Sequence, residues 1–177
     1  MSPMVRIPYS IEFALLGCLH RQPMHGYELY QHINQPHGIG LIWRIKQSQL
    51  YALIDKLEND GLVEVAYIEA QVTHPQRKVY HLTPQGEETF LRWMRSPVEE
   101  TRSIRMEFMA KLYFARQEGK EELASLLLAQ EKTAQKWLES LHGQENQSET
   151  EFDRQVFSFR AGQVEATIQW LRSYQQP

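Results

Sequence analysis

The sequence has few of the residues that hold small secreted or fibrous proteins together. Its 177 residues include one cysteine, Cys18, so an intramolecular disulfide is excluded and a reducing cytoplasm is favoured. Only 9 glycines and 8 prolines argue against a loop-rich or fibrous chain. The longest apolar run near the N-terminus, residues 13–19, is far shorter than the ~20 residues that cross a bilayer, and no cleavage site follows it. We therefore expect a cytoplasmic globular protein without a signal peptide or a membrane span.

Positive charge is scarce as well, because the formal net charge is −3 and the sequence pI is about 6.2. When the chain is divided after Ser96, the first part holds 9 basic and 9 acidic residues and the remainder holds 10 and 13. Six of the 7 histidines lie in the first part. This balance does not by itself indicate a nucleic-acid binder, so any anion-binding surface has to come from a local group of basic side chains.

Apolar periodicity predicts helices through most of the first part, with one interruption by strands. The predicted helices lie near residues 10–20, 25–35, 47–60 and 83–95. Between the last two, strand-forming residues at 62–73 and 77–82 predict a β-hairpin that turns at 74–76. Thr83 is expected to cap the fourth helix, with Pro84 in its first turn, where proline is tolerated.

The second part is expected to be helical throughout. The apolar spacing predicts helices at residues 104–116, 123–141 and 149–174, with a polar loop at 142–148. The whole pattern predicts a mainly α fold with two domains, divided at residues 96 and 97. The first domain has the element order of a winged helix-turn-helix with a two-stranded β-hairpin wing, and the second is all-helical.

Several short motifs occur in a fixed order along the first domain. They are IEFALLG at residues 11–17, PMHGYEL at 23–29, SQLY at 48–51, LENDGLV at 57–63 and RKVYHLTPQG at 77–86. This series resembles the PadR family of bacterial transcriptional regulators. The stretch RMEFMAKLYFA at 105–115 is similar to the start of that family's longer C-terminal dimerisation domain. The resemblance implies a homodimer that binds a palindromic operator, usually as a repressor, and that a small, often aromatic, effector releases.

The residues add a DNA-binding prediction of their own. On the third helix, ~100° per residue places Ser48, Tyr51 and Asp55 opposite the apolar stripe, where hydroxyl groups suit base edges and phosphates. An acidic residue at Asp55, where the family is often basic, weakens phosphate attraction or alters base choice. The competing interpretation is an ordinary solvated face. The predicted DNA-binding residues are His25, Tyr27, Arg44, Lys46, Ser48, Gln49, Tyr51, Lys56, Arg77 and Lys78.

Two further sets of residues concern the effector and the dimer. Family members that sense planar aromatics use apolar surfaces at the dimer centre and between domains. Trp93 with Met94, on the helix that joins the two parts, is the candidate here, and ordinary core packing is the alternative. The C-terminal helices carry more apolar surface than one helix leaves exposed, although packing within one chain is the alternative. The predicted dimerisation residues are Phe108, Leu112, Phe152, Val156, Phe159, Val164, Ile168 and Leu171.

Other classes of function find no support in the sequence. No nucleophile–base arrangement, phosphate loop or carboxylate cluster is present, so we do not expect an enzyme. The histidines at 20, 25, 32 and 37 lack the paired spacing of zinc sites, and neither a metal nor a cofactor is expected. The sequence thus predicts a transcriptional regulator whose partners are duplex DNA, a second copy and a small aromatic effector. The alternative is a winged-helix protein–protein adaptor without DNA binding.

Overall fold

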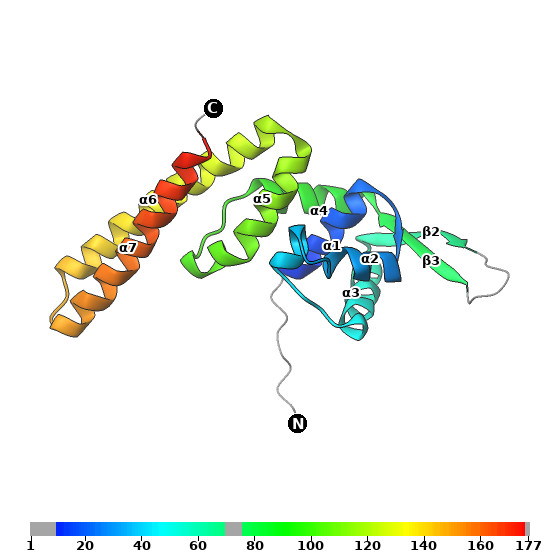
Figure 1. Ribbon diagram of the computed structural model, residues 1–177, viewed down its shortest axis with the longest axis horizontal. Helices are drawn as coiled ribbons and strands as arrows, with labels where there is room; N and C mark the ends of the chain where they lie inside the picture. Colours follow the sequence, from blue (N-terminus) through cyan, green and yellow to red (C-terminus); the bar gives the residue numbers. More distant parts are fainter. Residues whose placement is uncertain (1–9, 70–75, 176–177) are drawn as a thin grey trace, which may run out of the picture. The chain divides into compact units, whose positions relative to one another are not determined.

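The computed structural model describes residues 10–69 and 76–175, which form two compact units that divide between residues 93 and 94. The first unit contains α1 (Ser10–Arg21), β1 (Met24–His25), α2 (Gly26–Ile33), η1 (Gly38–Leu41), α3 (Gln47–Asn59), β2 (Val63–Glu69), β3 (Arg77–Leu82) and most of α4 (Pro84–Arg95). The second contains η2 (Thr101–Arg105), α5 (Glu107–Glu118), α6 (Lys120–Asn146) and α7 (Glu151–Ser173). Figure 1 shows the order of these elements along the chain. Within the described residues, no helix is long and apolar enough to cross a membrane.

The first unit has three helices, a hairpin and a fourth helix, which confirms the predicted winged helix. Its core is apolar and tightly closed, with Leu15, Leu29 and Leu50 each 0% exposed. Cys18 lies in this core as expected, and burial raises the pKa of its thiol to about 12. The thiol is therefore an apolar packing group and is not reactive.

The sheet of the first unit has one more strand than the sequence predicts. Its order is β1-β3-β2, with both pairings antiparallel, and the short β1 pairs Met24 with Tyr80 and His25 with Val79. A two-residue strand carries no alternation that a sequence can reveal, so only β2 and β3 were foreseeable. The expected turn falls largely on residues 70–75, which lie outside the described part. The extra strand attaches the start of α2 directly to the wing.

The junction between the hairpin and α4 forms as predicted. The Thr83 hydroxyl donates to Gly61 O at 2.7 Å and accepts a hydrogen bond from Gly86 N at 3.0 Å, so it caps α4. A Cβ at Gly86 would lie 1.9 Å from Leu62 O, so only glycine permits this approach of the α4 start to the hairpin.

The second unit is helical, but its boundaries differ from the prediction. The segment expected as one helix from residue 104 is η2 followed by α5, and α6 continues to Asn146 through residues predicted to form a loop. Those residues are polar because this end of α6 is largely exposed, and a polar exposed helix resembles a loop in sequence. Figure 1 shows α6 and α7 side by side as an antiparallel pair.

Polar clamps hold the interior of the second unit. The buried Gln130 side chain accepts from Val98 N at 2.7 Å and donates to Val98 O at 3.2 Å. The buried Lys111 ammonium donates to Ser96 O at 3.0 Å, and burial lowers the pKa of this lysine. Each clamp satisfies a polar group that would be costly to bury alone, so the segment after α4 is fixed to α5 and α6.

Candidate DNA-binding interface

The exposed face of α3 is the one that its periodicity predicts. Leu50, Leu53, Ile54 and Leu57 point into the core, at most 5% exposed, whereas Ser48, Tyr51 and Asp55 are exposed. The start of the helix is fixed because Lys46 N donates to Gln49 Oε1 at 3.0 Å. The Gln49 carbonyl oxygen is therefore used by its own helix, and its amide N–H groups are the part left to meet a partner.

The start of α2 is a capping box built on His25. The His25 Nδ1 accepts from Glu28 N at 3.1 Å, and His25 N donates to Glu28 Oε2 at 3.0 Å. His25 is 8% exposed as a residue, so it is chiefly a buried cap, and the predicted backbone contact is confined to its other ring nitrogen. Because Nδ1 accepts, Nε2 carries the proton of the neutral ring.

A donor on the wing faces this nitrogen. Arg77 Nη1 lies 3.3 Å from His25 Nε2, and both atoms are donors in that tautomer. The carboxylate oxygen Glu28 Oε2 lies 3.6 Å from His25 Nε2, which is beyond hydrogen-bond distance. Two neighbouring donors with this spacing are suited to a shared anionic acceptor.

Tyr51 of α3 packs against the start of α2. A Cβ at Gly26 would lie 2.6 Å from Tyr51 Cε1, so glycine at the first residue of α2 makes room for the tyrosine ring. Behind it, Tyr80 of β3 is 5% exposed, and its pKa is raised by burial and by the nearby Glu58 and Asp55 carboxylates. The Tyr80 hydroxyl therefore stays neutral at physiological pH.

These elements enclose a small pocket of about 230 Å³ on the first unit. It is lined by His25, Gly26, Tyr27, Tyr51, Gln76, Arg77, Lys78 and Tyr80. The positive dipole end of α2 favours an anion there. Tyr27 and Tyr51 are 43% and 39% exposed and can donate hydroxyl groups. The pocket therefore has the size and the donors to hold a phosphate group.

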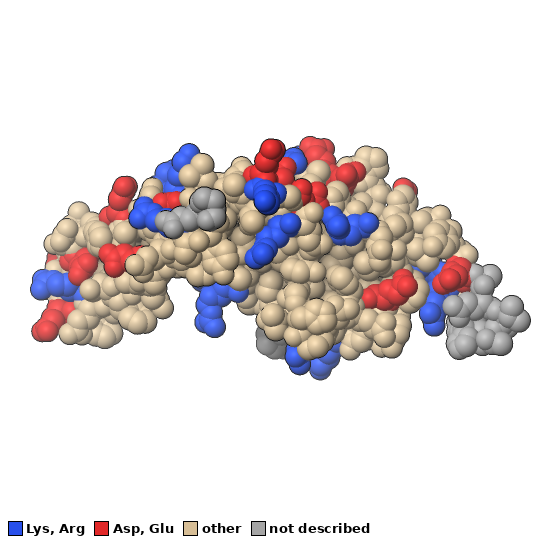
Figure 2. Space-filling model, turned by 45° about the horizontal axis from the view of Figure 1, so that its top comes forward, with Lys and Arg blue, Asp and Glu red and all other residues tan. Residues whose placement is uncertain are grey.

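The other predicted DNA-binding residues are placed less centrally. Arg44 and Lys46 are exposed ahead of α3. Lys56 donates to Glu12 Oε1 at 2.8 Å, which ties α3 to α1, and Lys78 lies 3.8 Å from Glu58 Oε2. Basic and acidic side chains are interspersed over the face seen in Figure 2, so positive potential is local.

Gly26, Gln76 and Tyr80 belong to the pocket but were not predicted. The signal that could have found them is the PMHGYEL motif, in which glycine opens a helix directly after a histidine cap. Without β1, however, the sequence gives no reason to place that motif beside β3.

The predicted effector pair is enclosed by protein. Trp93 is 7% exposed and its ring stacks on Phe13 with centroids 5.2 Å apart, while Met94 is 0% exposed. A ligand that touched the Trp93 ring face would have to displace Phe13. The effector role of these two residues stays a prediction.

The predicted dimerisation residues divide into two groups. Phe108, Leu112, Val164, Ile168 and Leu171 are at most 7% exposed, so they pack within their own chain. Phe152 and Phe159 are 72% and 68% exposed, and Val156 between them is half-buried. Only this second group, at helical spacing along α7, is available to a partner.

The fold defines a winged helix-turn-helix protein, and the pocket lies where the start of α2, α3 and β3 meet in that fold. Residues 15–92 match the transcriptional regulator PadR-like family. The negative transcriptional regulator PadR of Bacillus subtilis is 29% identical over 135 residues, covering 75% of this chain and 71% of that protein. Over its first unit, this chain is therefore similar to the PadR-like transcriptional regulators.

Two further similarities cover different shares of this chain. A probable transcriptional regulator of Mycobacterium tuberculosis is 29% identical over 93 residues, which are 52% of this chain and 48% of that protein. The crystal structure of Bacillus subtilis PadR in complex with operator DNA aligns with 94% of this chain and 98% of that one, at 23% identity and a TM-score of 0.48.

Proposed function

We propose that this protein is a repressor that binds a pseudo-palindromic operator as a homodimer and is released by a small effector. The observation that carries the DNA-binding part is the pocket where the start of α2, Tyr51 of α3 and Arg77 and Lys78 of β3 meet. A pocket of this kind beside an exposed recognition helix fits a backbone phosphate next to the major groove. It also explains how a chain with a net charge of −3 binds a polyanion.

The exposed face of α3 supplies the sequence-reading part of the proposal. Ser48, at the start of α3, can donate to a base edge or a phosphate. Asp55 lies further along the same face, and a carboxylate in the major groove can accept from the N4 amino group of cytosine. We therefore assign Asp55 a role in base choice, at some cost in phosphate attraction.

The homodimer rests on the exposed apolar side chains of α7. Phe152 and Phe159 are seven residues apart and so lie on one face of the helix. Phenylalanine has no polar group to hydrogen-bond with water, so a face of this kind is typical of an interface. A two-fold dimer would present two recognition helices about 34 Å apart, as a pseudo-palindrome requires.

The test of this function is the recovery of an operator from genomic DNA. Fragments that bind the full-length protein would be sequenced, and the enriched fragment would be titrated at low and high salt. We expect one pseudo-palindromic motif, an affinity that falls steeply with salt, and reduced reporter expression from the adjoining promoter. An adaptor would enrich no motif and show little affinity for DNA at either salt concentration, which would overturn the proposal.

A further inference from the structure

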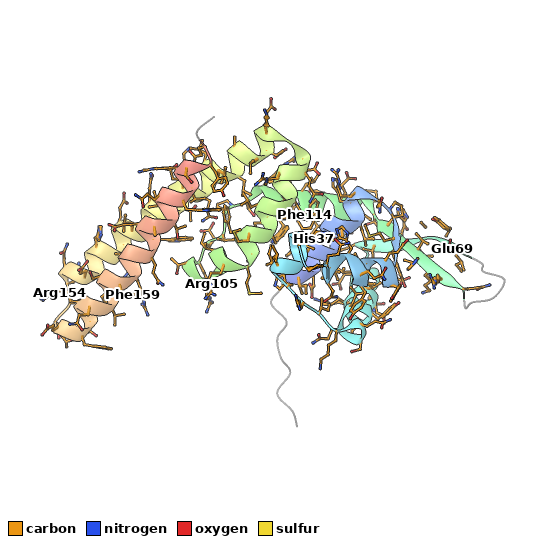
Figure 3. The ribbon with its side chains drawn as sticks, viewed as in Figure 1. His37, Glu69, Arg105, Phe114, Arg154 and Phe159 are labelled. Carbon is orange, nitrogen blue, oxygen red and sulfur yellow. The ribbon has the colours of Figure 1, made fainter. Side chains whose placement is uncertain are left out.

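Gln49, the third residue of α3, has a side-chain amide whose orientation is fixed. Its Oε1 accepts from Lys46 N at 3.0 Å, and because a backbone N–H group can only donate, the atom beside it must be the oxygen. Gln49 is exposed, so its Nε2 group, with two N–H donors, is the part that can meet a partner. Figure 3 shows the side chains of this helix, and His37, which it labels, lies in the segment that leads from α2 to α3.

This orientation limits which bases Gln49 can recognise in a major groove. A glutamine that reads adenine uses both ends of its amide, since the oxygen accepts from N6 and the nitrogen donates to N7. In Gln49 the oxygen is held at the backbone of Lys46. The side chain is left with donors, which suit a base atom that accepts, namely O6 or N7 of guanine or O4 of thymine.

Ala52 places a methyl group beside this donor. It follows Gln49 by three residues, so the two side chains are neighbours on the helix, with about 5–6 Å between their Cβ atoms. Ala52 is exposed, whereas Leu50 and Leu53 are buried in the core. An exposed alanine on a recognition helix allows a close approach to a base edge and offers it only an apolar contact.

We propose that Gln49 and Ala52 together read a thymine of the operator, a proposal that rests on the DNA-binding function above. Gln49 Nε2 donates to O4 of this thymine, and the Ala52 methyl group packs against its C5 methyl group. Thymine alone presents an acceptor next to a methyl group in the major groove, which matches a donor next to a methyl group on α3. Guanine has no methyl group, and the amino groups of cytosine and adenine are donors that would face the Gln49 donor.

Two base analogues test the two contacts separately, with the full-length protein and the enriched genomic fragment as the probe. Deoxyuridine in place of one thymidine removes only the C5 methyl group. Paired with guanine, 5-methylcytosine keeps the methyl group and replaces O4 by an amino group. At one thymine of each half-site, we expect binding about threefold weaker with deoxyuridine and about tenfold weaker with 5-methylcytosine. Fluorescence anisotropy with labelled DNA measures both changes.

Two variants assign these contacts to the two residues. Gln49→Glu keeps an oxygen for Lys46 N and replaces the donor by an acceptor, so it should prefer 5-methylcytosine to thymine by about fivefold or more. Ala52→Gly removes the methyl group, so it should bind the thymine and uracil DNAs equally and still discriminate against 5-methylcytosine. Each result is a ratio of affinities of one protein for two DNAs, so the lower helix propensity of glycine does not alter it.

Gln47→Glu is the matched control for the added charge. Gln47 is an exposed glutamine at the first residue of the same helix, and about 100° per residue places it on the opposite flank of the exposed face from Gln49. The extra carboxylate should lower the affinity for all of the DNAs alike, because it repels the phosphates. The ratios between thymine, uracil and 5-methylcytosine should stay those of the unmodified protein.

The outcomes separate this inference from the proposed function. If an operator is found but none of its thymines shows both effects, the repressor stands and the inference is overturned. The same holds if Gln49→Glu weakens binding to every DNA alike, because Gln49 would then contact the DNA backbone and not a base. If no DNA motif is enriched at all, the DNA-binding function itself fails, and the inference fails with it.

Discussion

The two units expose different aromatic side chains. On the first unit, the exposed aromatics among the described residues are tyrosines, namely Tyr27, Tyr51 and Tyr67. On the second, Phe152 and Phe159 are more exposed still, at 72% and 68%, with Tyr174 the one exposed tyrosine of the described part. A tyrosine hydroxyl can bind a polar partner, whereas a phenylalanine ring gains only from being covered by apolar surface. The difference supports the proposal that the first unit binds DNA and the second pairs with another copy of the chain.

A charge placed on the phenylalanine face should have the largest effect. Phe159→Asp would bury an aspartate in the proposed interface, so we expect the dissociation constant of the dimer to rise about thirtyfold or more. Sedimentation equilibrium measures this change. Ser158→Asp, next to it but on another exposed side of α7, adds the same charge as a control and should leave the dimer intact. A monomeric unmodified protein, or a dimer that Phe159→Asp does not affect, would contradict the proposal that the exposed phenylalanines of α7 form the interface.

A methyl group at the start of α2 should have a smaller effect, confined to DNA binding. In Gly26→Ala the new Cβ would lie 2.6 Å from Tyr51 Cε1, so the Tyr51 ring must move from the pocket. We expect operator affinity to fall about tenfold, as when one good hydrogen-bonded contact is lost, with the dimer unchanged. Fluorescence anisotropy with labelled operator measures it. Gly143→Ala is the matched control, because a Cβ there would have no neighbour within 4 Å, and its affinity should not change.

The smallest effect concerns the end of α7. Glu131 accepts from Arg172 Nε at 2.7 Å and from Gln175 Nε2 at 3.0 Å, and these hydrogen bonds, Arg172 first, lower the pKa of the Glu131 carboxyl. A lowered pKa stabilises the fold above the ordinary value of about 4.3, and this stabilisation is lost as pH falls through the lowered value.

Glu131→Gln should therefore reduce the free energy of unfolding by about 1 kcal/mol at pH 7. Below the lowered pKa the unmodified carboxyl is protonated too, so the difference between the two proteins should shrink as the pH falls from 7 through that pKa. Thermal denaturation of both proteins over a series of falling pH values measures this. A difference that stays the same over the whole series would mean that the charge of Glu131 contributes nothing.

The sequence predicts the elements of the first unit well because each has a strong local pattern. The Leu50, Leu53, Ile54 and Leu57 stripe fixes which side of α3 is buried, and this in turn predicts that Tyr51 is exposed. The pocket could not be predicted in full, because it depends on β1. The pairing of His25 with Val79 joins residues 54 positions apart, and no local pattern encodes it.

In the second unit, sequence patterns locate the apolar residues of a helix but do not tell which of them are exposed. Periodicity identifies Val164 and Phe159 alike as apolar residues of one helix, but only the packing of α6 shows that Val164 is 4% exposed and Phe159 68%. An apolar pattern predicts that a face is covered, and it does not tell whether the cover is the same chain or another.

The salt dependence of operator binding tests the central claim most directly, that the pocket at the start of α2 holds a DNA phosphate. Affinity would be measured over a range of salt concentrations for the unmodified protein, Arg77→Ala and Arg92→Ala. Arg92 is an exposed arginine of α4 that pairs with Glu88 and does not line the pocket. We expect Arg77→Ala to lower the magnitude of the slope of log affinity against log salt by about 1, because one phosphate contact is lost. Arg92→Ala should leave the slope unchanged. An unchanged slope in Arg77→Ala would contradict it.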